Sequence, residues 1–386
     1  MEDVFVSRRR IQILDTTLRD GEQSPGIALR PHEKAEIAAQ LERLRVDVIE
    51  AGFAAASPGD FEGVHAVAET AGAATVGSLA RSRKEDLDAA AEALADAKRS
   101  RVHIVLGTSA LHMEKKLGLE PQEVVEQAAW SVKYAARLVD EVEFSCEDAT
   151  RSDPAFVARV CRVAIRAGAK IINLPDTVGY ALPAEYAAFI ADVRRRCPEL
   201  RDVELSVHCH NDLGLAVANS LAGVQAGASQ VECTINGLGE RAGNASLEEI
   251  VVALRVRDEL FGVHTDIDTT QITATSKLVS ERTGYVVQRN KAIVGANAFA
   301  HEAGIHQDGM LKDARTYQIV DPAMVGVRMT LPLGKHSGRH AFAKACADRG
   351  LQLDKQALDT AFRRFKELAD AGGAVALEDL FEEAAA

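Results

Sequence analysis

Two histidines with strand spacing are the first sign of chemistry in this sequence. His208 and His210 are separated by one residue, so on a β-strand both imidazoles point the same way while Cys209 faces the other side. Asp20 and Asn244 are further candidate ligands, because each follows a different short apolar run. Two nitrogen and two oxygen ligands suit Mn²⁺, Mg²⁺ or a catalytic Zn²⁺, and the sequence leaves the choice open.

Other polar residues stand at similar places. Arg19 precedes Asp20 and would stabilise an oxyanion if a metal ion lay beside it, although an isolated arginine is usually part of a surface ion pair. Glu147 follows another apolar run, where it is either a reactive carboxylate or one member of a solvated charge cluster. The glycine-rich turn 237–244 either binds a ligand or simply closes a loop. Its candidate binding residues are Gly237, Gly239 and Arg241.

These polar residues follow eight short apolar runs that alternate with amphipathic stretches, which is the pattern of repeated strand–helix units. Successive runs begin 27 to 39 residues apart, a spacing that favours an α/β fold of the (β/α)₈ TIM-barrel type. Reactive residues of such barrels lie at the carboxyl ends of the strands. Closure makes the first, seventh and eighth strands neighbours, so the four candidate ligands should lie together. The runs begin near Ile11, Val48, Thr75, Val102, Glu141, Ile171, Glu204 and Val231, and the predicted helices cover 31–44, 82–97, 121–138, 154–167, 183–196 and 213–227.

The strand–helix alternation ends after a last barrel helix at 246–260. We therefore predict a catalytic barrel over residues 1–265 and a mostly helical C-terminal appendage over 266–386. Within the appendage, 270–283 and 355–371 have helical spacing, whereas 295–334 is rich in glycine and polar residues and is predicted to be a loop-heavy connector.

The composition is that of a large globular chain, with 47% of its 386 residues hydrophobic and 26% charged. No run approaches the roughly 20 apolar residues of a membrane span, so we expect no membrane partner. A net charge of −12 argues against nucleic acid as a partner, while anionic small molecules remain candidates. The six cysteines form no C-x-x-C pair and no secretory signal is evident, so we expect reduced thiols and a cytoplasmic protein.

Three motifs carry a resemblance to a known family. The stretches DTTLRDGEQ (15–23), VHCHNDLG (207–214) and GLGERAGN (237–244) resemble the metal-dependent barrels that condense or cleave acyl-CoA esters, which include 2-isopropylmalate, homocitrate and citramalate synthases. The stretches 144–151, 174–180 and 291–311 look most like the 2-isopropylmalate synthases of that family. The similarity covers essentially the whole chain.

The resemblance implies an acyltransferase of leucine biosynthesis. Acetyl-CoA would undergo a Claisen condensation with 3-methyl-2-oxobutanoate, and thioester hydrolysis would release 2-isopropylmalate and CoA. A divalent ion would polarise the ketone, Arg19 would stabilise the alkoxide, and K⁺ is a further candidate cofactor. Proton transfer would involve Glu147, His306 and Tyr317, the last two contributed by the partner subunit of a homodimer with shared active sites. By the same resemblance, Leu79 and His112 would line the branched-chain pocket, with Ser145 and Thr177 holding the substrate carboxylate.

Alternative substrates and activities differ at particular residues. Homocitrate synthases resemble this chain but carry a basic residue and a histidine where it has Glu143 and Gly77, so a distal carboxylate would meet repulsion. Citramalate synthase remains the alternative, because pyruvate would lose only a few kcal/mol of apolar contact. An acyl-CoA lyase is disfavoured because the turn 237–244 has no cysteine, and a non-catalytic regulator that binds 2-oxo acids is disfavoured because the metal and proton-transfer residues are present. Longer synthases add a leucine-binding domain near where this sequence ends, so we expect no feedback by that route.

Overall fold

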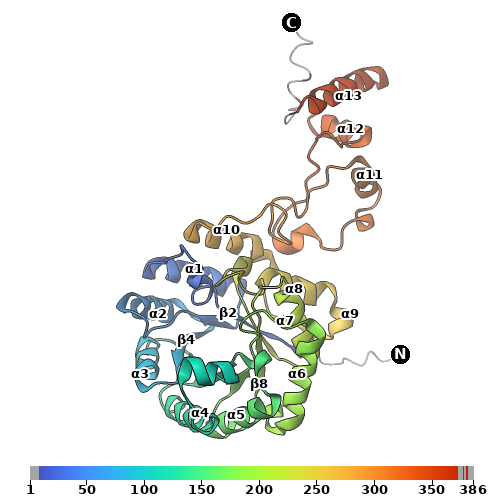
Figure 1. Cartoon of the computed structure of the whole chain (residues 1–386). Helices are drawn as coiled ribbons and strands as arrows, with labels where there is room; N and C mark the ends of the chain where they lie inside the picture. The colour runs from blue at the N-terminus through green and yellow to red at the C-terminus, as the bar shows by residue number, and fades with distance from the viewer. Residues whose placement is uncertain (1–7, 373–376, 378–379, 381–386) are drawn as a thin grey trace, which may run out of the picture. The chain divides into compact units, whose positions relative to one another are not determined.

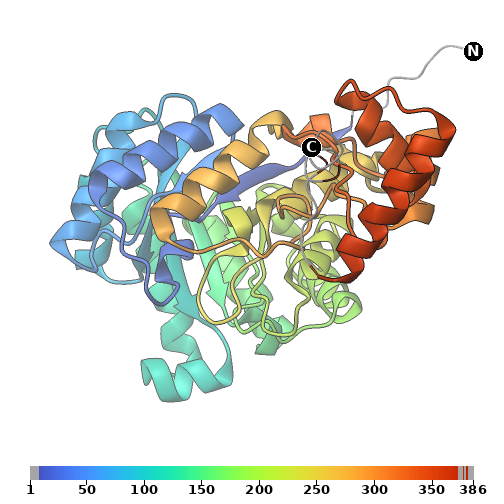
Figure 2. The ribbon, with the colours of Figure 1, turned by 90° about the horizontal axis from the view of Figure 1, so that it is seen from above.

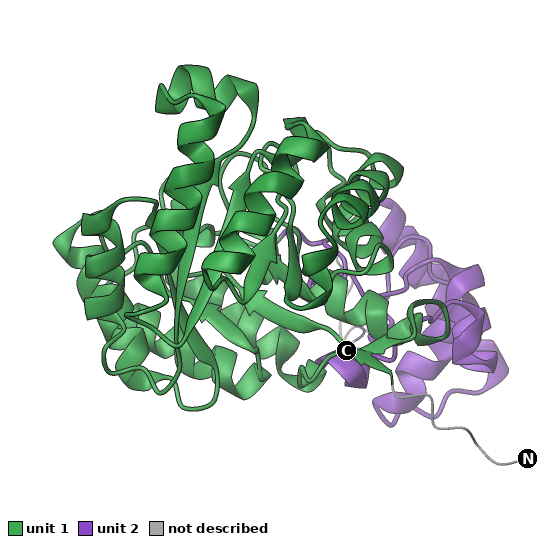
Figure 3. Cartoon of the chain, turned by 90° about the horizontal axis from the view of Figure 1, so that it is seen from below, with its two compact units in different colours: residues 1–287 green, residues 288–386 purple. Residues whose placement is uncertain are grey.

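The structure is a computed structural model that describes residues 8–372, 377 and 380 (Figure 1). The chain divides into two compact units, residues 1–287 and residues 288–386 (Figure 3). None of the helices in the described residues is both long and apolar enough to span a membrane.

The first unit contains a closed barrel of eight parallel strands, which confirms the predicted (β/α)₈ fold. The strands follow one another around the barrel in chain order, and the last pairs with the first. Each is short and mostly buried, as expected of parallel strands covered by helices. In order they are β2 (Gln12–Asp15), β3 (Val48–Glu50), β4 (Thr75–Arg81), β5 (Ser100–Gly107), β6 (Glu141–Glu147), β7 (Ile171–Asn173), β8 (Glu204–His208) and β9 (Gln230–Cys233).

Helices surround the barrel and bury one apolar face each. In α5, Val157, Val160, Cys161 and Ala164 have the i, i+3, i+4, i+7 spacing of a single face and are all fully buried. Five of the helices begin at a proline, a residue that fits the first helical turn because its missing N–H needs no partner there. These helices are α1 (Pro31–Leu44), α2 (Pro58–Thr70), α3 (Lys84–Ala93), α4 (Pro121–Ala135), α5 (Pro154–Ala167), α6 (Pro183–Arg196), α7 (Ala216–Gln225), α8 (Leu247–Val256) and the short α9 (Asp258–Phe261).

Two further elements complete the first unit. A two-stranded parallel sheet joins β1 (Arg9–Arg10) to β10 (Val263–His264). Helix α10 (Ile272–Thr283) lies alongside α1, as Figure 2 shows in gold and blue. The contact includes a hydrogen bond from Gln40 to Thr275 and an ion pair between Arg282 and Glu36.

The second unit is helical and has its own core. Its helices are α11 (Gly304–Lys312), α12 (Arg339–Asp348) and α13 (Lys355–Asp370). The rings of Phe342, Phe362 and Phe365 pack together with centroids 5.2 to 6.2 Å apart. Helix α11 lies inside the stretch expected to be loop-heavy, because its weakly amphipathic sequence gave no helical signal. Helix α12 is likewise one that the sequence pattern did not predict.

Candidate active site

The carboxyl ends of β2 and β8 bring together one carboxylate and two imidazoles. The Nε2 atoms of His208 and His210 lie 3.8 and 3.6 Å from Oδ2 of Asp20, and the two imidazole rings are 4.9 Å apart. All three side chains are buried. One ligand atom from each lies within 4.8 Å of the other two, which is close enough for all three to bind one ion.

The protonation states at this cluster suit metal binding. Burial lowers the pKa of His208 to about 4 and also lowers that of His210, so both rings are neutral near pH 7. Burial alone would raise the pKa of Asp20, but Arg19 and the two histidines hold it well below its usual range. Two neutral imidazoles and an ionised carboxylate are the forms in which these side chains bind a divalent cation.

Asn244 reaches the same cluster from the turn after β9. Its Nδ2 donates to Oδ1 of Asp20 at 2.7 Å, while its Oδ1 is buried without a hydrogen-bond partner. The turn needs glycine at 239, where φ is +150° and a Cβ would lie 2.1 Å from Nδ2 of Asn244. Gly237 packs against Ser246 in the same way, so both predicted glycines shape the turn. The orphaned amide oxygen of Asn244 and the donor set around it fit a divalent cation.

Arg19 is held rigidly beside the cluster. Its Nε donates to Glu50 at 2.6 Å and its Nη1 donates to Asp20 at 2.7 Å, and the side chain is 10% exposed. It therefore presents a fixed positive charge beside the cluster of Asp20, His208 and His210.

A cavity of about 260 Å³ opens above these residues at the mouth of the barrel. Phe53, Leu79, Val105 and Pro175 provide its apolar lining. It is small and mixed in character, which suits a short acid with an apolar side chain. Of the predicted site residues, those that line the cavity are Arg19, Asp20, Leu79, Ser145, Glu147, Thr177, His208, His210 and Arg241.

A buried histidine that the sequence analysis missed lies at the floor of this cavity. His103 on β5 contacts Glu50 through Nδ1 at 2.7 Å and Ser145 through Nε2 at 2.6 Å. Burial alone would lower the pKa of His103, but the carboxylates around it, chiefly Glu50, raise it to about 9. Ser145 also accepts from Asn173 at 2.8 Å, so both its lone pairs are occupied and its O–H remains to donate into the cavity.

Glu147, at the end of β6, has two basic neighbours. Lys116 lies 2.5 Å from its Oε1, and Nδ1 of His112 lies 3.7 Å from its Oε2. His112 is thus next to Glu147 and is not among the residues that line the cavity. Lys116 had no signal in the sequence analysis, since it lies on the short π-helix His112–Leu117 between β5 and α4.

The structure removes one argument about substrate choice. Glu143 is fully buried below the cavity and pairs with Arg101 at 2.9 Å. It does not line the cavity, so its expected repulsion of a distal carboxylate has no direct geometric basis.

His306 and Tyr317 belong to the second unit and lie next to each other there. Their ring centroids are 4.3 Å apart, and both side chains are exposed. Gly309 makes room for this contact, since a Cβ there would lie 2.7 Å from Tyr317.

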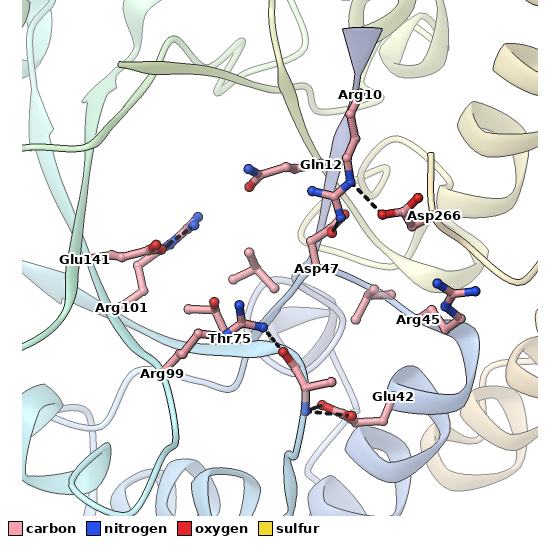
Figure 4. A pocket seen from close by; sticks show the side chains of 13 residues that line it. Arg10, Gln12, Glu42, Arg45, Asp47, Thr75, Arg99, Arg101, Glu141 and Asp266 are labelled. Carbon is pink, nitrogen blue, oxygen red and sulfur yellow. Dashed lines mark hydrogen bonds and ion pairs between the residues drawn. The ribbon is translucent and has the colours of Figure 1, made fainter. Parts of the chain in front are cut away.

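A different cavity, of about 290 Å³, lies at the amino-terminal ends of the barrel strands (Figure 4). Its charges are largely paired with one another: Arg10 contacts Asp47 and Asp266, and Arg101 contacts Glu141 at 2.7 Å (Figure 4). In (β/α)₈ proteins this end of the barrel usually contributes to stability, not to catalysis.

Comparisons with known proteins give the class of the chain. The family model described as HMGL-like matches residues 10–279, and the model described as homocitrate synthase post-HMGL domain-like matches residues 293–373. A hydroxymethylglutaryl-CoA lyase structure from Pseudomonas aeruginosa superposes with a TM-score of 0.63 over 72% of this chain and 95% of that one. At 20% identity it bears on the fold alone.

Curated relatives narrow the class. A 2-isopropylmalate synthase of Neisseria meningitidis serogroup B is 57% identical over 96% of this chain and 72% of its own length. Those of Chromobacterium violaceum and Dechloromonas aromatica are 58% and 56% identical over 96% and 97% of this chain, each with 73% of the relative covered. The chain therefore belongs to the 2-isopropylmalate synthases, acyltransferases within the HMGL-like family.

Proposed function

We propose that the chain condenses acetyl-CoA with 3-methyl-2-oxobutanoate and hydrolyses the thioester, releasing 2-isopropylmalate and CoA in leucine biosynthesis. The observation that carries this proposal is the cluster of Asp20, His208 and His210 beside Arg19 at the mouth of a cavity, in a chain 57% identical to 2-isopropylmalate synthases. That cluster and Arg19 can act on a single ketone.

The metal site is proposed to comprise Asp20, His208, His210 and Asn244. Mn²⁺ or Mg²⁺ would be preferred over Zn²⁺, because the donor set includes a carboxylate and an amide oxygen. A bound divalent ion supplies Lewis acidity to the ketone oxygen of the 2-oxo acid. K⁺ is proposed as a possible further activator.

The 2-oxo acid is proposed to bind with its carboxylate toward Ser145 and Thr177. Thr177 Oγ1 accepts from the backbone N–H of Asp148 at 2.9 Å, which leaves its O–H to donate, as at Ser145. Arg241, which donates to the carbonyl of Thr177 at 2.8 Å, fixes this edge of the cavity. Arg19 would hold the alkoxide that forms on the ketone oxygen.

The condensation needs a proton to leave the methyl group of acetyl-CoA as the carbon–carbon bond forms. Glu147 is proposed to take part in that transfer from the edge of the cavity, together with His306 and Tyr317. Water then attacks the thioester carbonyl, so the product carboxylate forms as CoA leaves.

A homodimer with shared active sites is proposed as the working form. The second unit exposes large apolar side chains near His306 and Tyr317 in sequence, with Ile305 80% and Ile319 84% exposed. Such side chains favour burial against another surface, and a partner subunit would supply one.

The apolar lining supports the branched substrate. Leu79, Phe53, Val105 and Pro175 would contact an isopropyl group, which pyruvate lacks. Citramalate formation from pyruvate is the second candidate, since loss of those contacts weakens binding by only a few kcal/mol.

A cytoplasmic location is proposed from the thiols. All six cysteines are buried and none forms a disulfide in the described residues, as expected for a reducing compartment.

The test is thiol release from acetyl-CoA with a panel of 2-oxo acids, with and without a chelator. We expect chelator-sensitive release that is fastest with 3-methyl-2-oxobutanoate. Faster turnover of pyruvate would replace the substrate but keep the chemistry, and release with no 2-oxo acid tested would reject the function.

A further inference from the structure

A buried lysine, Lys34, takes no part in the reaction proposed so far. It lies on α1, in the layer of helices outside the barrel, and is only 1% exposed. A lysine is almost never fully buried unless its charge is paired. The partners of Lys34 therefore indicate its role.

All three N–H donors of the Lys34 ammonium group have partners. Nζ donates to the backbone carbonyl of Leu18 at 2.9 Å and to that of Ala51 at 3.0 Å, and it lies 2.6 Å from Oε2 of Glu22. Among the described residues, no other group donates to the Leu18 carbonyl. Lys34 thus joins the loop after β2 to the residue that follows β3 and leaves none of its own donors unpaired.

The two carbonyls adjoin the two residues of a buried ion pair in the active site. Leu18 directly precedes Arg19 in the loop after β2. Ala51 directly follows Glu50, whose carboxylate accepts from Nε of Arg19 at 2.6 Å. Lys34 therefore fixes the backbone next to both members of this ion pair, from the helix layer outside the barrel.

Two glycines leave the space that the side chain of Lys34 occupies. A Cβ at Gly52 would lie 3.1 Å from Nζ of Lys34, and a Cβ at Gly63 would lie 3.0 Å from its Cδ. Gly63 stands inside α2, where glycine is less favourable than alanine. Helix α2 thus gives up some helix stability at this position, and the space that results is filled by Lys34.

We propose that Lys34 is a positioning residue, which keeps Arg19 and Asp20 in the geometry that stabilises the alkoxide and binds the divalent ion. It acts through the two backbone carbonyls and does not itself line the active-site cavity. Groups that orient metal ligands from behind control both metal affinity and activity. This inference rests on the proposed function and adds a residue outside the cavity on which the reaction depends.

The test compares Mn²⁺ binding and kinetics of the intact protein with those of Lys34→Met. Methionine is unbranched and flexible, so it can fill the same space, but it donates no hydrogen bond. The Kd for Mn²⁺, measured without substrate by electron paramagnetic resonance, should rise about 3- to 10-fold. At saturating Mn²⁺, kcat should fall about 10- to 100-fold while the KM for 3-methyl-2-oxobutanoate changes less than about threefold, because the alkoxide forms only after the 2-oxo acid has bound.

Charge alone predicts the opposite change in metal affinity. Removing a positive charge near a cation site favours binding of the cation, so weaker Mn²⁺ binding by Lys34→Met would report displaced ligands. Gln40→Met is the matched control, because it removes a buried hydrogen bond of the same helix, from Gln40 to Thr275 at 3.1 Å. This control should lower the free energy of unfolding but keep the wild-type Kd for Mn²⁺ and the wild-type kcat.

Glu22→Gln provides a second and milder variant. Its amide oxygen can keep the hydrogen bond that Glu22 accepts from the backbone N–H of Leu29 at 2.8 Å, so the charge pairing with Lys34 is what is lost. We expect the Kd for Mn²⁺ to rise about 2- to 5-fold at high salt, where longer-range effects of charge are screened. Glu36→Gln, which breaks the ion pair of α1 with Arg282, should leave this Kd unchanged.

Wild-type Mn²⁺ affinity and kcat in Lys34→Met would overturn the proposal, as would equal changes in Lys34→Met and Gln40→Met. Should Lys34→Met fail to fold, the comparison of Glu22→Gln with Glu36→Gln decides, and equal Kd values for these two would reject the role of Lys34. A wild type that binds Mn²⁺ more tightly than Lys34→Met but releases no thiol with any 2-oxo acid would reject the proposed function. That result would leave the effect of Lys34 on the metal site supported.

Discussion

At the amino-terminal end of the barrel, Arg10 and Arg101 each contact two carboxylates, whereas at the carboxyl-terminal end Asp20 faces two neutral histidines and a single arginine. Both ends hold a cavity of similar size, about 290 and 260 Å³. Arginines and carboxylates line both cavities, but histidines line only the one at the carboxyl-terminal end. The two ends also differ in how completely their polar groups are paired.

Buried polar atoms without partners distinguish the two ends. At the carboxyl end, Oδ1 of Asn244, Oδ1 of Asn173 and Nδ1 of His210 have no hydrogen bond, while no described residue lining the amino-terminal cavity has such an atom. Each orphaned group costs about 1–3 kcal/mol of folding free energy. We infer that this cost persists at one end because a metal ion and substrate satisfy the two asparagine oxygens on binding, and that the other end is built for stability.

The largest expected effect is loss of the metal. His208→Ala combined with His210→Ala should abolish stoichiometric divalent metal and lower CoA release by at least about a thousandfold, because the Lewis acid is gone. Elemental analysis and a thiol assay measure the two. The control is His65→Ala, which removes a surface histidine that lies within 4 Å of Glu69 and Asp96, and it should keep both metal and activity. Metal that survives the double substitution would place the site elsewhere.

The next largest effect on turnover is expected from removing the charge of a glutamate at one end of β6, with the glutamate at the other end as control. Glu147 ends β6 beside the active-site cavity and Glu141 begins it beside the amino-terminal cavity. Glu147→Gln should lower kcat by about 10²–10⁴ with little change in KM for the 2-oxo acid, whereas Glu141→Gln should leave kcat unchanged. Steady-state kinetics of both variants provide the comparison. Equal rates for the two would remove Glu147 from proton transfer.

Arg101 tests the stabilising role of the amino-terminal end. It is 3% exposed and binds Glu141, Glu143 and Gln230 at 2.7 to 2.9 Å. Arg101→Met should lower the free energy of unfolding by about 3–5 kcal/mol, because the buried Glu143 loses its counter-charge. Urea unfolding measures this, and turnover per folded molecule should stay within about twofold. Arg45→Met, at an exposed arginine of the same cavity, should cost less than about 0.5 kcal/mol. Equal losses of stability in Arg101→Met and Arg45→Met would mean that the ion pairs of Arg101 contribute little to stability.

The sequence predicted the barrel well because fully buried parallel strands read as apolar runs. The nine helical segments that it located each contain a helix in the described residues, with shifts at some ends. Helix α2 was missed, since its buried face holds only Gly63, Val64, Val67 and Ala68. The order of the strands also predicted that Asp20 and the two histidines lie together, while their role as ligands stays a prediction.

Residues embedded in an apolar run escaped notice. His103 lies between the apolar residues Val102 and Ile104 of β5, and Glu50 ends β3 directly after Val48 and Ile49. The apolar pattern that revealed each strand therefore concealed the polar side chain within it. Glu143 was expected to meet the substrate but pairs with Arg101 instead. Sequence spacing fixes which face of a strand a side chain takes, but not how deep it lies along the barrel axis. Contacts such as Lys116 to Glu147 depend on an irregular helix that no periodicity predicts.

His103 gives the pH dependence of the active-site floor. Its pKa of about 9 in the folded protein exceeds the ordinary value of 6.5, so its protonated form stabilises the fold below pH 6.5 and this contribution is lost as the pH rises through 9. The whole contribution is at most about 3 kcal/mol. Urea unfolding in the presence of a chelator should show that the free energy of unfolding falls between pH 6.5 and 9.5. In His103→Gln this dependence on pH should be weaker. A wild type whose stability is constant over this range would contradict a charged His103.

The smallest loss of stability is expected from substitutions at Glu42. These substitutions test whether contacts at the amino-terminal end of the barrel affect stability and not turnover. Glu42 accepts hydrogen bonds of 2.7 to 3.1 Å from the backbone N–H groups of residues 72, 73 and 74, which shape the turn before β4. Glu42→Ala should lower the free energy of unfolding by about 1–2 kcal/mol, because those donors return to water only in part, and Glu42→Gln should recover some of the loss through its remaining carbonyl oxygen. Urea unfolding measures both, and kcat should not change. A fall in kcat without a fall in stability would show that the amino-terminal end influences the chemistry, and the division between the two ends of the barrel would no longer hold.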